Sequence, residues 1–254
     1  MTRLPAILFL AVTACEGTLP PLRGIAEAGR DPIVVFVGGT SGDLFAVPAS
    51  GGEVVPLTFS AVSETRPVLA PDGGAVAFLR GVALGDSTPG GVWVMNLVSG
   101  AERNVVLPKG AGAPSRVGWS ADGRSLIVAT ERGVYRAPAP PAEGEAAQVP
   151  ATGRAAAESS LAVVLGSPAF ARVVACERPA DLCVAGDTGA RALLAAGSRD
   201  PARWGPDSVA YFKGDELLVR PLGRGRERRV ELGNAPRRPR QPTVFAADPT
   251  GAPR

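Results

Sequence analysis

The sequence predicts an all-β fold in which a four-stranded antiparallel unit is repeated along the chain. Two patterns indicate repetition: an apolar–turn–apolar unit occurs at 66–81 and again at 115–130, and a second apolar pattern occurs in five copies. The composition agrees, because 32 glycines and 25 prolines among 254 residues favour many short strands joined by turns over long helices. Apolar residues make up 45% of the chain, which is enough to fill a core.

The first pattern centres on an Asp-Gly pair. When 66–81 is aligned with 115–130, Arg66 falls on Arg116 and the two Asp-Gly pairs coincide. Such a pair between apolar runs makes a tight hairpin, because aspartate hydrogen-bonds its own backbone and glycine takes the positive φ that the turn needs. A degenerate copy that begins at Trp204 keeps the aspartate but has no glycine after it. The residues predicted to serve these turns, rather than to act as catalytic acids, are Asp72, Gly73, Asp122, Gly123 and Asp207.

The second pattern is an apolar strand that follows a polar or glycine-containing turn. Its five copies read GDLFAVP (42–48), GGVWVMN (90–96), RGVYRAP (132–138), ADLCVAG (180–186) and DELLVRP (215–221). Most successive units lie about 40 to 50 residues apart, which is the period of the four-stranded blades of a β-propeller, and the last two copies are closer together. We therefore predict a β-propeller of four-stranded blades.

The two ends of the chain predict how the propeller closes. The first blade, 33–58, has three strands and lacks its leading one, whereas 243–247 is a leading strand with no blade after it. Pairing these two segments would let the N- and C-terminal strands share one blade and would remove two exposed sheet edges. Five blades follow from this count. Six remain the alternative, for which 139–158 is the only unassigned stretch.

The repeats resemble those of TolB-type propellers. The resemblance is carried by LAPDGGAVAFLRG with GGVWVMNLVSGAE, and by WSADGRSLIVAT with RGVYRAP, and it extends over about 31–251. The same repeats occur in the propeller domains of prolyl-oligopeptidase-like peptidases, so the resemblance implies a fold and little about function. TolB itself has six blades and a separate N-terminal α/β domain, and neither fits this length.

The first residues predict an export signal. Arg3 precedes the apolar run 4–14, which is too short to span a bilayer, where about 20 residues are needed, and matches the apolar core of a secretory signal. Residues 12–15 resemble a bacterial lipoprotein box, which implies lipid attachment at Cys15. An ordinary signal peptide that contains a cysteine is the alternative.

The predicted organisation is a lipoprotein signal peptide at 1–14, a lipidated tether at 15–30 and a β-propeller domain at 31–251. Glu16, rather than aspartate, follows the cysteine. By the resemblance to bacterial lipoproteins, a residue other than aspartate at this position implies that the protein is anchored in the outer membrane, on its periplasmic face or at the cell surface. The tether is inferred from its polar, proline-containing sequence.

The residue types argue against the commonest catalytic sites. The chain has no histidine, which excludes a Ser-His-Asp triad and the commonest zinc ligand. No metal and no cofactor are predicted. Carboxylates in predicted loops could still serve a hydrolase or lyase; they are Asp43, Asp86, Asp187 and Asp215.

The most basic stretch of the chain is a second candidate site. Its predicted contact patch for an anionic lipid or polyanionic partner consists of Arg224, Arg226, Arg228 and Arg229. No aromatic residues interleave with these arginines, which argues against a nucleic-acid partner. A solvated strand edge is the alternative explanation.

These observations lead to three functional hypotheses. The first is a monomeric, lipid-anchored propeller that binds or scaffolds an envelope protein or a glycan without catalysis. The second is a propeller hydrolase or lyase that uses the loop carboxylates. The third is a truncated remnant of a larger propeller protein.

A disulfide between Cys176 and Cys183 is predicted if the protein is exported, because the two residues flank a short predicted hairpin loop. Two separate buried thiols are the alternative. We expect the unreduced, denatured protein to bind no alkylating reagent at Cys176 or Cys183, and the reduced protein to be alkylated at both. Mass spectrometry of the peptides decides, and alkylation of both residues before reduction would contradict the disulfide.

Overall fold

The computed structural model describes residues 21–22, 24–81, 90–141, 144–149, 173–175, 181–185, 191–205 and 207–246. Within these ranges the regular secondary structure consists of strands, so the predicted all-β fold is confirmed. Among the described residues, no helix has the length and apolar character needed to cross a bilayer.

The described strands form five antiparallel sheets, which are blades of the predicted propeller. Blade 1 contains β21 (Arg240–Phe245), β1 (Ile33–Gly38), β2 (Asp43–Pro48) and β4 (Val55–Pro56). Blade 2 contains β5 (Glu64–Leu69), β6 (Ala75–Arg80), β7 (Gly91–Asn96) and β8 (Glu102–Val105). Blade 3 contains β9 (Pro114–Trp119), β10 (Ser125–Thr130), β11 (Gly133–Pro138) and β12 (Ala147–Gln148).

The last two blades follow the same antiparallel plan. The described part of blade 4 contains β13 (Val173–Ala175), β14 (Leu182–Ala185) and β15 (Arg191–Ala195). Blade 5 contains β16 (Ser198–Trp204), β17 (Ser208–Lys213), β18 (Glu216–Pro221) and β19 (Arg228–Val230). A short parallel pair, β3 (Gly52–Glu53) with β20 (Leu232–Gly233), links the end of blade 5 to blade 1.

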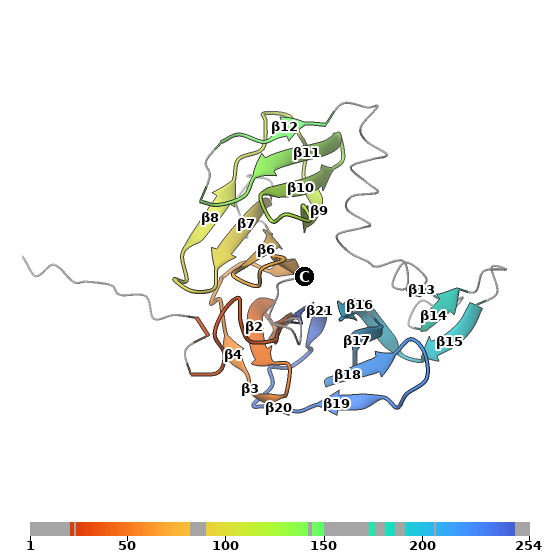
Figure 1. Ribbon diagram of the computed structural model, residues 1–254. Helices are drawn as coiled ribbons and strands as arrows, with labels where there is room; N and C mark the ends of the chain where they lie inside the picture. Colours follow the sequence, from red (N-terminus) through yellow and green to blue (C-terminus); the bar gives the residue numbers. More distant parts are fainter. Residues whose placement is uncertain are drawn as a thin grey trace, which may run out of the picture.

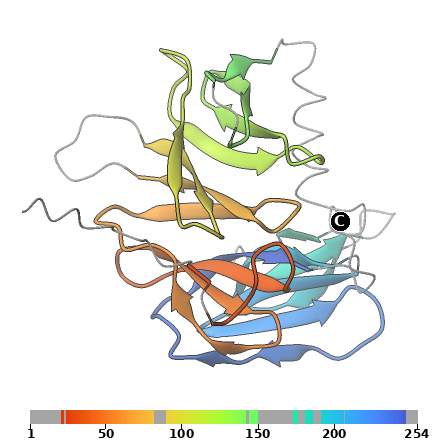
Figure 2. The same cartoon turned by 60° about the vertical axis from the view of Figure 1, so that its left-hand side comes forward.

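The first strand of each blade, in the orders given above, is called its leading strand. Neighbouring blades pack largely through these leading strands. β16 of blade 5 contacts β21 of blade 1, β21 contacts β5 of blade 2, and β5 contacts β9 of blade 3, while blade 4 reaches blade 5 through β14 and β16. In Figure 1 the labelled leading strands β9, β16 and β21 lie toward the middle of the molecule, whereas β8, β12 and β19 lie at its periphery. Figure 2 shows blade 2 between blade 3 and blade 1.

The first and last strands of the described chain pair in blade 1, as predicted. β21 pairs antiparallel with β1, which places Phe245 opposite Ile33 and Thr243 opposite Val35. Alternate side chains of β1 point to opposite faces of the sheet. Val35 therefore packs in a cluster shared with blade 2, and Phe36 packs in a cluster shared with blade 5. All six residues of β1 are buried as a result.

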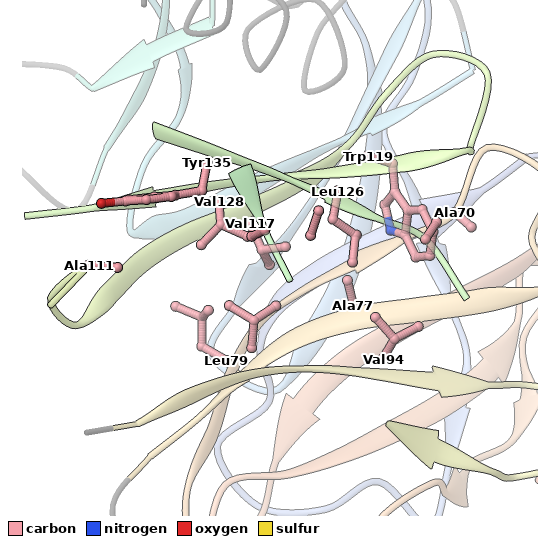
Figure 3. Close-up of a cluster of buried hydrophobic side chains, with 14 residues drawn as sticks. Ala70, Ala77, Leu79, Val94, Ala111, Val117, Trp119, Leu126, Val128 and Tyr135 are labelled. Carbon is pink, nitrogen blue, oxygen red and sulfur yellow. The ribbon is translucent and has the colours of Figure 1, made fainter. Parts of the chain in front are cut away.

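Apolar side chains between blades 2 and 3 form the cluster drawn in Figure 3. Trp119 is 3% exposed and lies beside Ala70 in this cluster. Its indole Nε1 donates a hydrogen bond of 2.9 Å to the carbonyl of Val68, so the ring both fills the interface and satisfies its own polar atom. Burying a large aromatic side chain in this way contributes roughly 2–3 kcal/mol.

The described residues before β1 also belong to this packing. Leu22 is 2% exposed and lies in the cluster shared by blades 1 and 2, together with the partly buried Ile25. The N–H of Gly29 donates to the carbonyl of Gly73 at 3.2 Å. The sequence predicts a polar tether at 15–30, because the few apolar side chains in this proline-containing segment give no periodic signal.

Removing β21 should destabilise the whole molecule, because it uncovers an edge of β1 and removes the buried side chain of Phe245. We expect deletion of 241–254 to lower the melting temperature by at least about 10 °C, measured by circular dichroism. A chain that ends at Ala246 keeps β21 and serves as the control. An unchanged melting curve for the longer deletion would show that strand closure does not stabilise the fold.

Candidate functional site

Three strained Xaa-Pro pairs mark the leading strands near the middle of the molecule. They are Arg66-Pro67 in β5, Asp200-Pro201 in β16 and Gln241-Pro242 in β21. The residue before each proline has a positive φ: 53° at Arg66, 52° at Asp200 and 51° at Gln241. Residues other than glycine rarely adopt this conformation, because the Cβ atom crowds the backbone. Such strain persists only where the surroundings impose it, and it is concentrated at functional sites.

Each pair lies in a β-bulge, where two residues of the leading strand face one residue of its neighbour. The pair in β5 lies opposite Phe78, the pair in β16 opposite Tyr211, and the pair in β21 opposite Phe36. These three aromatic residues are all fully buried. A leading strand has one free edge in its own sheet, so proline, which lacks an N–H donor, is tolerated there.

Hydrogen bonds from side chains join the leading strands of blades 1, 2 and 3. Gln241 Oε1 accepts from the N–H of Arg66 at 2.8 Å, and Thr243 Oγ1 accepts from the N–H of Leu69 at 3.1 Å. The bond from Trp119 to Val68 joins β9 to β5 in the same way. Backbone groups at the free edges are therefore satisfied by side chains of the next blade, which holds the bulges in place.

The leading strands carry exposed polar side chains, which we call the inner-strand surface. It is defined by Arg66, Arg116, Asp200 and Gln241, of which the first three are exposed and Gln241 is half-buried. The surface offers two guanidinium groups, one carboxylate and one amide. It can therefore bind a polar or charged ligand by hydrogen bonds and ion pairs. Arg66 and Arg116 occupy equivalent positions in the two internal repeats, but the sequence predicts no function for either residue.

A buried ion pair lies beside this surface, at the first residue of β5. Glu64 is 0% exposed, and its Oε1 accepts from Arg80 Nε at 3.0 Å and from Arg80 Nη2 at 2.7 Å. Its other oxygen accepts a hydrogen bond from Thr58 Oγ1, which itself accepts from the N–H of Leu44 at 2.8 Å. Thr58 and Leu44 belong to the blade 1 segment, so this network joins blade 1 to blade 2.

Arg80 extends the network across blade 2. Its Nη2 donates to Glu102 at 2.8 Å, and its guanidinium lies 4.4 Å from the ring centroid of Trp93. Burial raises the pKa of Glu64 above its ordinary value, although the bonds from Thr58 and Arg80 act in the opposite direction. Burial acts to lower the pKa of Arg80, but the bonds to Glu64 and Glu102 outweigh it and raise that pKa.

The predicted turn aspartates hydrogen-bond backbone groups of their own turns. Asp72 Oδ1 accepts from the N–H of Gly74 at 2.9 Å, and Asp122 Oδ1 accepts from the N–H of Arg124 at 3.1 Å. The bond from Ser120 Oγ to Asp122, 2.6 Å long, helps hold the pKa of Asp122 below its ordinary value. The glycines that follow have positive φ, 69° at Gly73 and 68° at Gly123. Asp207 lies in the turn before β17.

Of the predicted loop carboxylates, Asp43 and Asp215 are described by the structure, whereas Asp86 and Asp187 lie outside the described residues. Asp43 accepts from the N–H of Ser60 at 2.8 Å and from Ser41 Oγ, so both of its oxygens are engaged. Asp215 is exposed in the turn between β17 and β18.

The predicted lipid and disulfide residues are only partly described. Cys15 and Cys176 lie outside the described residues. Cys183 is 5% exposed and is disulfide-bonded. Its pairing with Cys176 stays a prediction.

The predicted basic patch is divided between engaged and open side chains. The guanidinium of Arg228 lies 4.6 Å from the ring centroid of Trp204. Arg229 pairs with Glu216 at 2.8 Å and with Glu231 at 3.5 Å. Arg224 and Arg226 are exposed in the segment before β19. Only part of the patch is therefore open to an anionic partner.

No protein-family model and no curated protein matches the chain. Among solved structures, the chain is similar to TolB from Acinetobacter baumannii, with 14% identity and a TM-score of 0.37, covering 88% of this chain and 68% of that one. It is also similar to a putative TolB from Agrobacterium tumefaciens, with 12% identity and a TM-score of 0.34, covering 79% and 64%. A third similar structure is dihydro-heme d1 dehydrogenase NirN in complex with DHE, with 18% identity and a TM-score of 0.32, covering 83% and 45%.

The chain thus spans between 45% and 68% of the lengths of these three structures. Within the part of the chain that the structure describes, no group of three or more histidine, cysteine or acidic residues could hold a metal ion.

The raised pKa of Glu64 predicts a pH dependence of stability with a definite sign. A carboxyl group whose folded-state pKa is raised binds its proton more tightly in the folded protein than in the unfolded chain. Its contribution is therefore fully present below the ordinary value of 4.5 and is lost as the pH rises through the folded-state pKa. We expect Glu64→Gln to remove this contribution from the pH profile of the unfolding free energy, measured by urea denaturation.

Glu64→Ala should have a much larger effect, because it leaves the partly buried Arg80 without its main partner. We expect a loss of about 3–5 kcal/mol in unfolding free energy. Glu102→Gln is the matched control and should cost about 1 kcal/mol or less, because Glu102 is more exposed. Equal losses for the two variants would contradict the central place of Glu64 in the network.

Proposed function

We propose that this chain is a lipid-anchored binding module of the bacterial envelope, which holds a protein or glycan partner on its inner-strand surface without catalysing a reaction. The observation that carries the proposal is the set of strained bulges. Three non-glycine residues with positive φ lie on leading strands that neighbour one another, and two of them, Arg66 and Asp200, expose charged side chains to solvent. A rigid surface of this kind loses little conformational entropy when a partner binds.

The chemical state of the acidic residues supports a binding role over catalysis. The carboxylates of Asp43, Asp72 and Asp122 accept hydrogen bonds within their own turns or from the neighbouring loop, and Glu64 is paired with Arg80. These groups are occupied with holding the fold.

The proposed lipid anchor fits the position of Leu22. A lipid on Cys15 would be linked to the buried Leu22 by a segment that spans at most roughly 25 Å when fully extended. The fold would therefore remain close to the membrane surface. Two acyl chains would hold it there firmly, since each buried methylene contributes roughly 0.8 kcal/mol.

One observation favours the alternative of a hydrolase or lyase. Asp200 is an exposed carboxylate with a strained backbone on the inner-strand surface, where it could act on a bound ligand. Hydrolysis of a substrate in a glycan and peptide panel, lost in Asp200→Asn, would favour the enzyme over the binding module.

The binding function is tested by photo-crosslinking capture from detergent-solubilised envelope, with Cys15→Ser as a matched variant. We expect the wild-type chain to fractionate with membranes and to capture a defined protein or glycan. Cys15→Ser should leave the membrane fraction but still capture the same partner from solubilised envelope, because only the anchor is lost. Failure of both chains to enrich any component over a crosslinker-only control would contradict the binding function, and membrane retention of Cys15→Ser would contradict the anchor.

A further inference from the structure

Phe59 projects into solvent from the segment that joins blade 1 to blade 2. It is 86% exposed, although the two residues before it, Leu57 and Thr58, are buried. Single exposed apolar side chains are common on protein surfaces and need no explanation by themselves. Phe59 differs because its surroundings keep it in this position.

The segment around Phe59 is fixed on both sides by hydrogen bonds. Thr58 is held by Glu64 and by the N–H of Leu44. The N–H of Ser60 donates to Asp43 at 2.8 Å, and the N–H of Glu64 donates to the carbonyl of Gly42 at 2.9 Å. The backbone therefore cannot turn Phe59 inward without breaking bonds that also hold the blade 1 turn at Gly42.

The segment that carries Arg237, Arg238 and Arg240 meets the same turn. The N–H of Gly39 donates to the carbonyl of Arg237 at 2.8 Å, which ties the segment before β21 to this turn. A methyl group placed on Gly42 would lie 3.0 Å from Arg240 Nη2 and 2.7 Å from Ser63 Oγ, so the two segments meet there. Arg240 precedes Gln241, whose side chain is bonded to the backbone of Arg66.

These arginines have no acidic partner among the described residues. Arg66, Arg237 and Arg238 are exposed and Arg240 is half-buried, and none forms an ion pair within the described part of the chain. Arg238 has a positive φ of 55° and precedes a proline, as Arg66 does. Two of the four guanidinium groups, those of Arg66 and Arg238, thus extend from strained backbone positions.

We infer that Phe59, Arg66, Arg237, Arg238 and Arg240, together the Phe59 surface, bind an acidic peptide segment of a protein partner that also carries an apolar side chain. Guanidinium groups bind carboxylates with two parallel hydrogen bonds. Aromatic and arginine side chains are enriched among the residues that dominate protein interfaces. Arg66 lies on a leading strand near the middle of the molecule, which an extended peptide can reach more readily than a flat bilayer can.

This inference rests on the proposed binding function: the Phe59 surface shares Arg66 with the inner-strand surface, extends the contact beyond it, and adds the chemistry of the partner. The test uses the full-length chain in detergent and two fluorescein-labelled peptides, EEELEEE and EEEGEEE, with binding followed by fluorescence anisotropy at low and high salt. We expect wild-type protein to bind both peptides, EEELEEE more tightly, and both more weakly at high salt. KKKLKKK should not bind.

Three variants separate the two kinds of contact. Phe59→Ala should weaken EEELEEE about ten-fold and leave EEEGEEE unchanged, because only the apolar contact is lost. Arg66→Asn and Arg238→Asn should weaken both peptides, and asparagine tolerates the positive φ at these positions. Val98→Ala, a substitution at another exposed apolar residue, is the control and should change neither affinity. Melting curves identify any variant that fails to fold.

The inference is wrong if neither peptide binds, if all three variants bind like the wild type, or if only vesicles of anionic phospholipid bind. Should the wild-type chain still capture a defined envelope partner by crosslinking, the binding function stands and the acidic-peptide chemistry alone fails. Equal capture of that partner by wild-type and Phe59→Ala chains would likewise show that the Phe59 surface is not part of the interface.

Discussion

The pairing of β21 with β1 is the constraint on which the rest of the molecule depends. β21 completes blade 1, and it is also the strand through which blade 1 contacts β16 of blade 5 and β5 of blade 2. Without it, β1 would have a free edge and Phe245 would have no place in the core. One long-range contact between the ends of the described chain thus fixes the positions of three blades, at the entropic cost of closing a very large loop.

The same contact explains why the candidate site lies where it does. A leading strand has one edge without a strand partner, and the structure satisfies that edge with side chains from the next blade, such as Gln241 and Thr243 on β5. Inside a strand, away from its ends, proline is found at edges and bulges. The Xaa-Pro bulges therefore occur on leading strands. Each strained residue costs about 1–3 kcal/mol, and the buried aromatic residue opposite each bulge offsets part of that cost.

The sequence predicted the features that depend on local chemistry. Asp72 and Asp122 could be assigned to turns because an Asp-Gly pair between apolar runs specifies its own hairpin. The shared blade could be predicted because a strand count that is one short at each end leaves one arrangement without free edges. The Glu64–Arg80 pair gave no such signal, since a charge at a strand end looks the same whether it is solvated or buried. The bulges could have been found, because a proline inside a strand pattern indicates an edge or a bulge.

The buried network and the two exposed surfaces are parts of one arrangement. Thr58 bonds Glu64, and the next residue, Phe59, is exposed, so the position of the aromatic side chain depends on a bond made inside the protein. Glu64 opens β5, and Arg66 follows it after one residue, with its N–H bonded to Gln241 of blade 1. Blade 1 and blade 2 are therefore joined twice within three residues of β5, once by a buried carboxylate and once at the strained bulge. The backbone that carries Arg66 is therefore ordered before a partner binds, so binding does not have to order it.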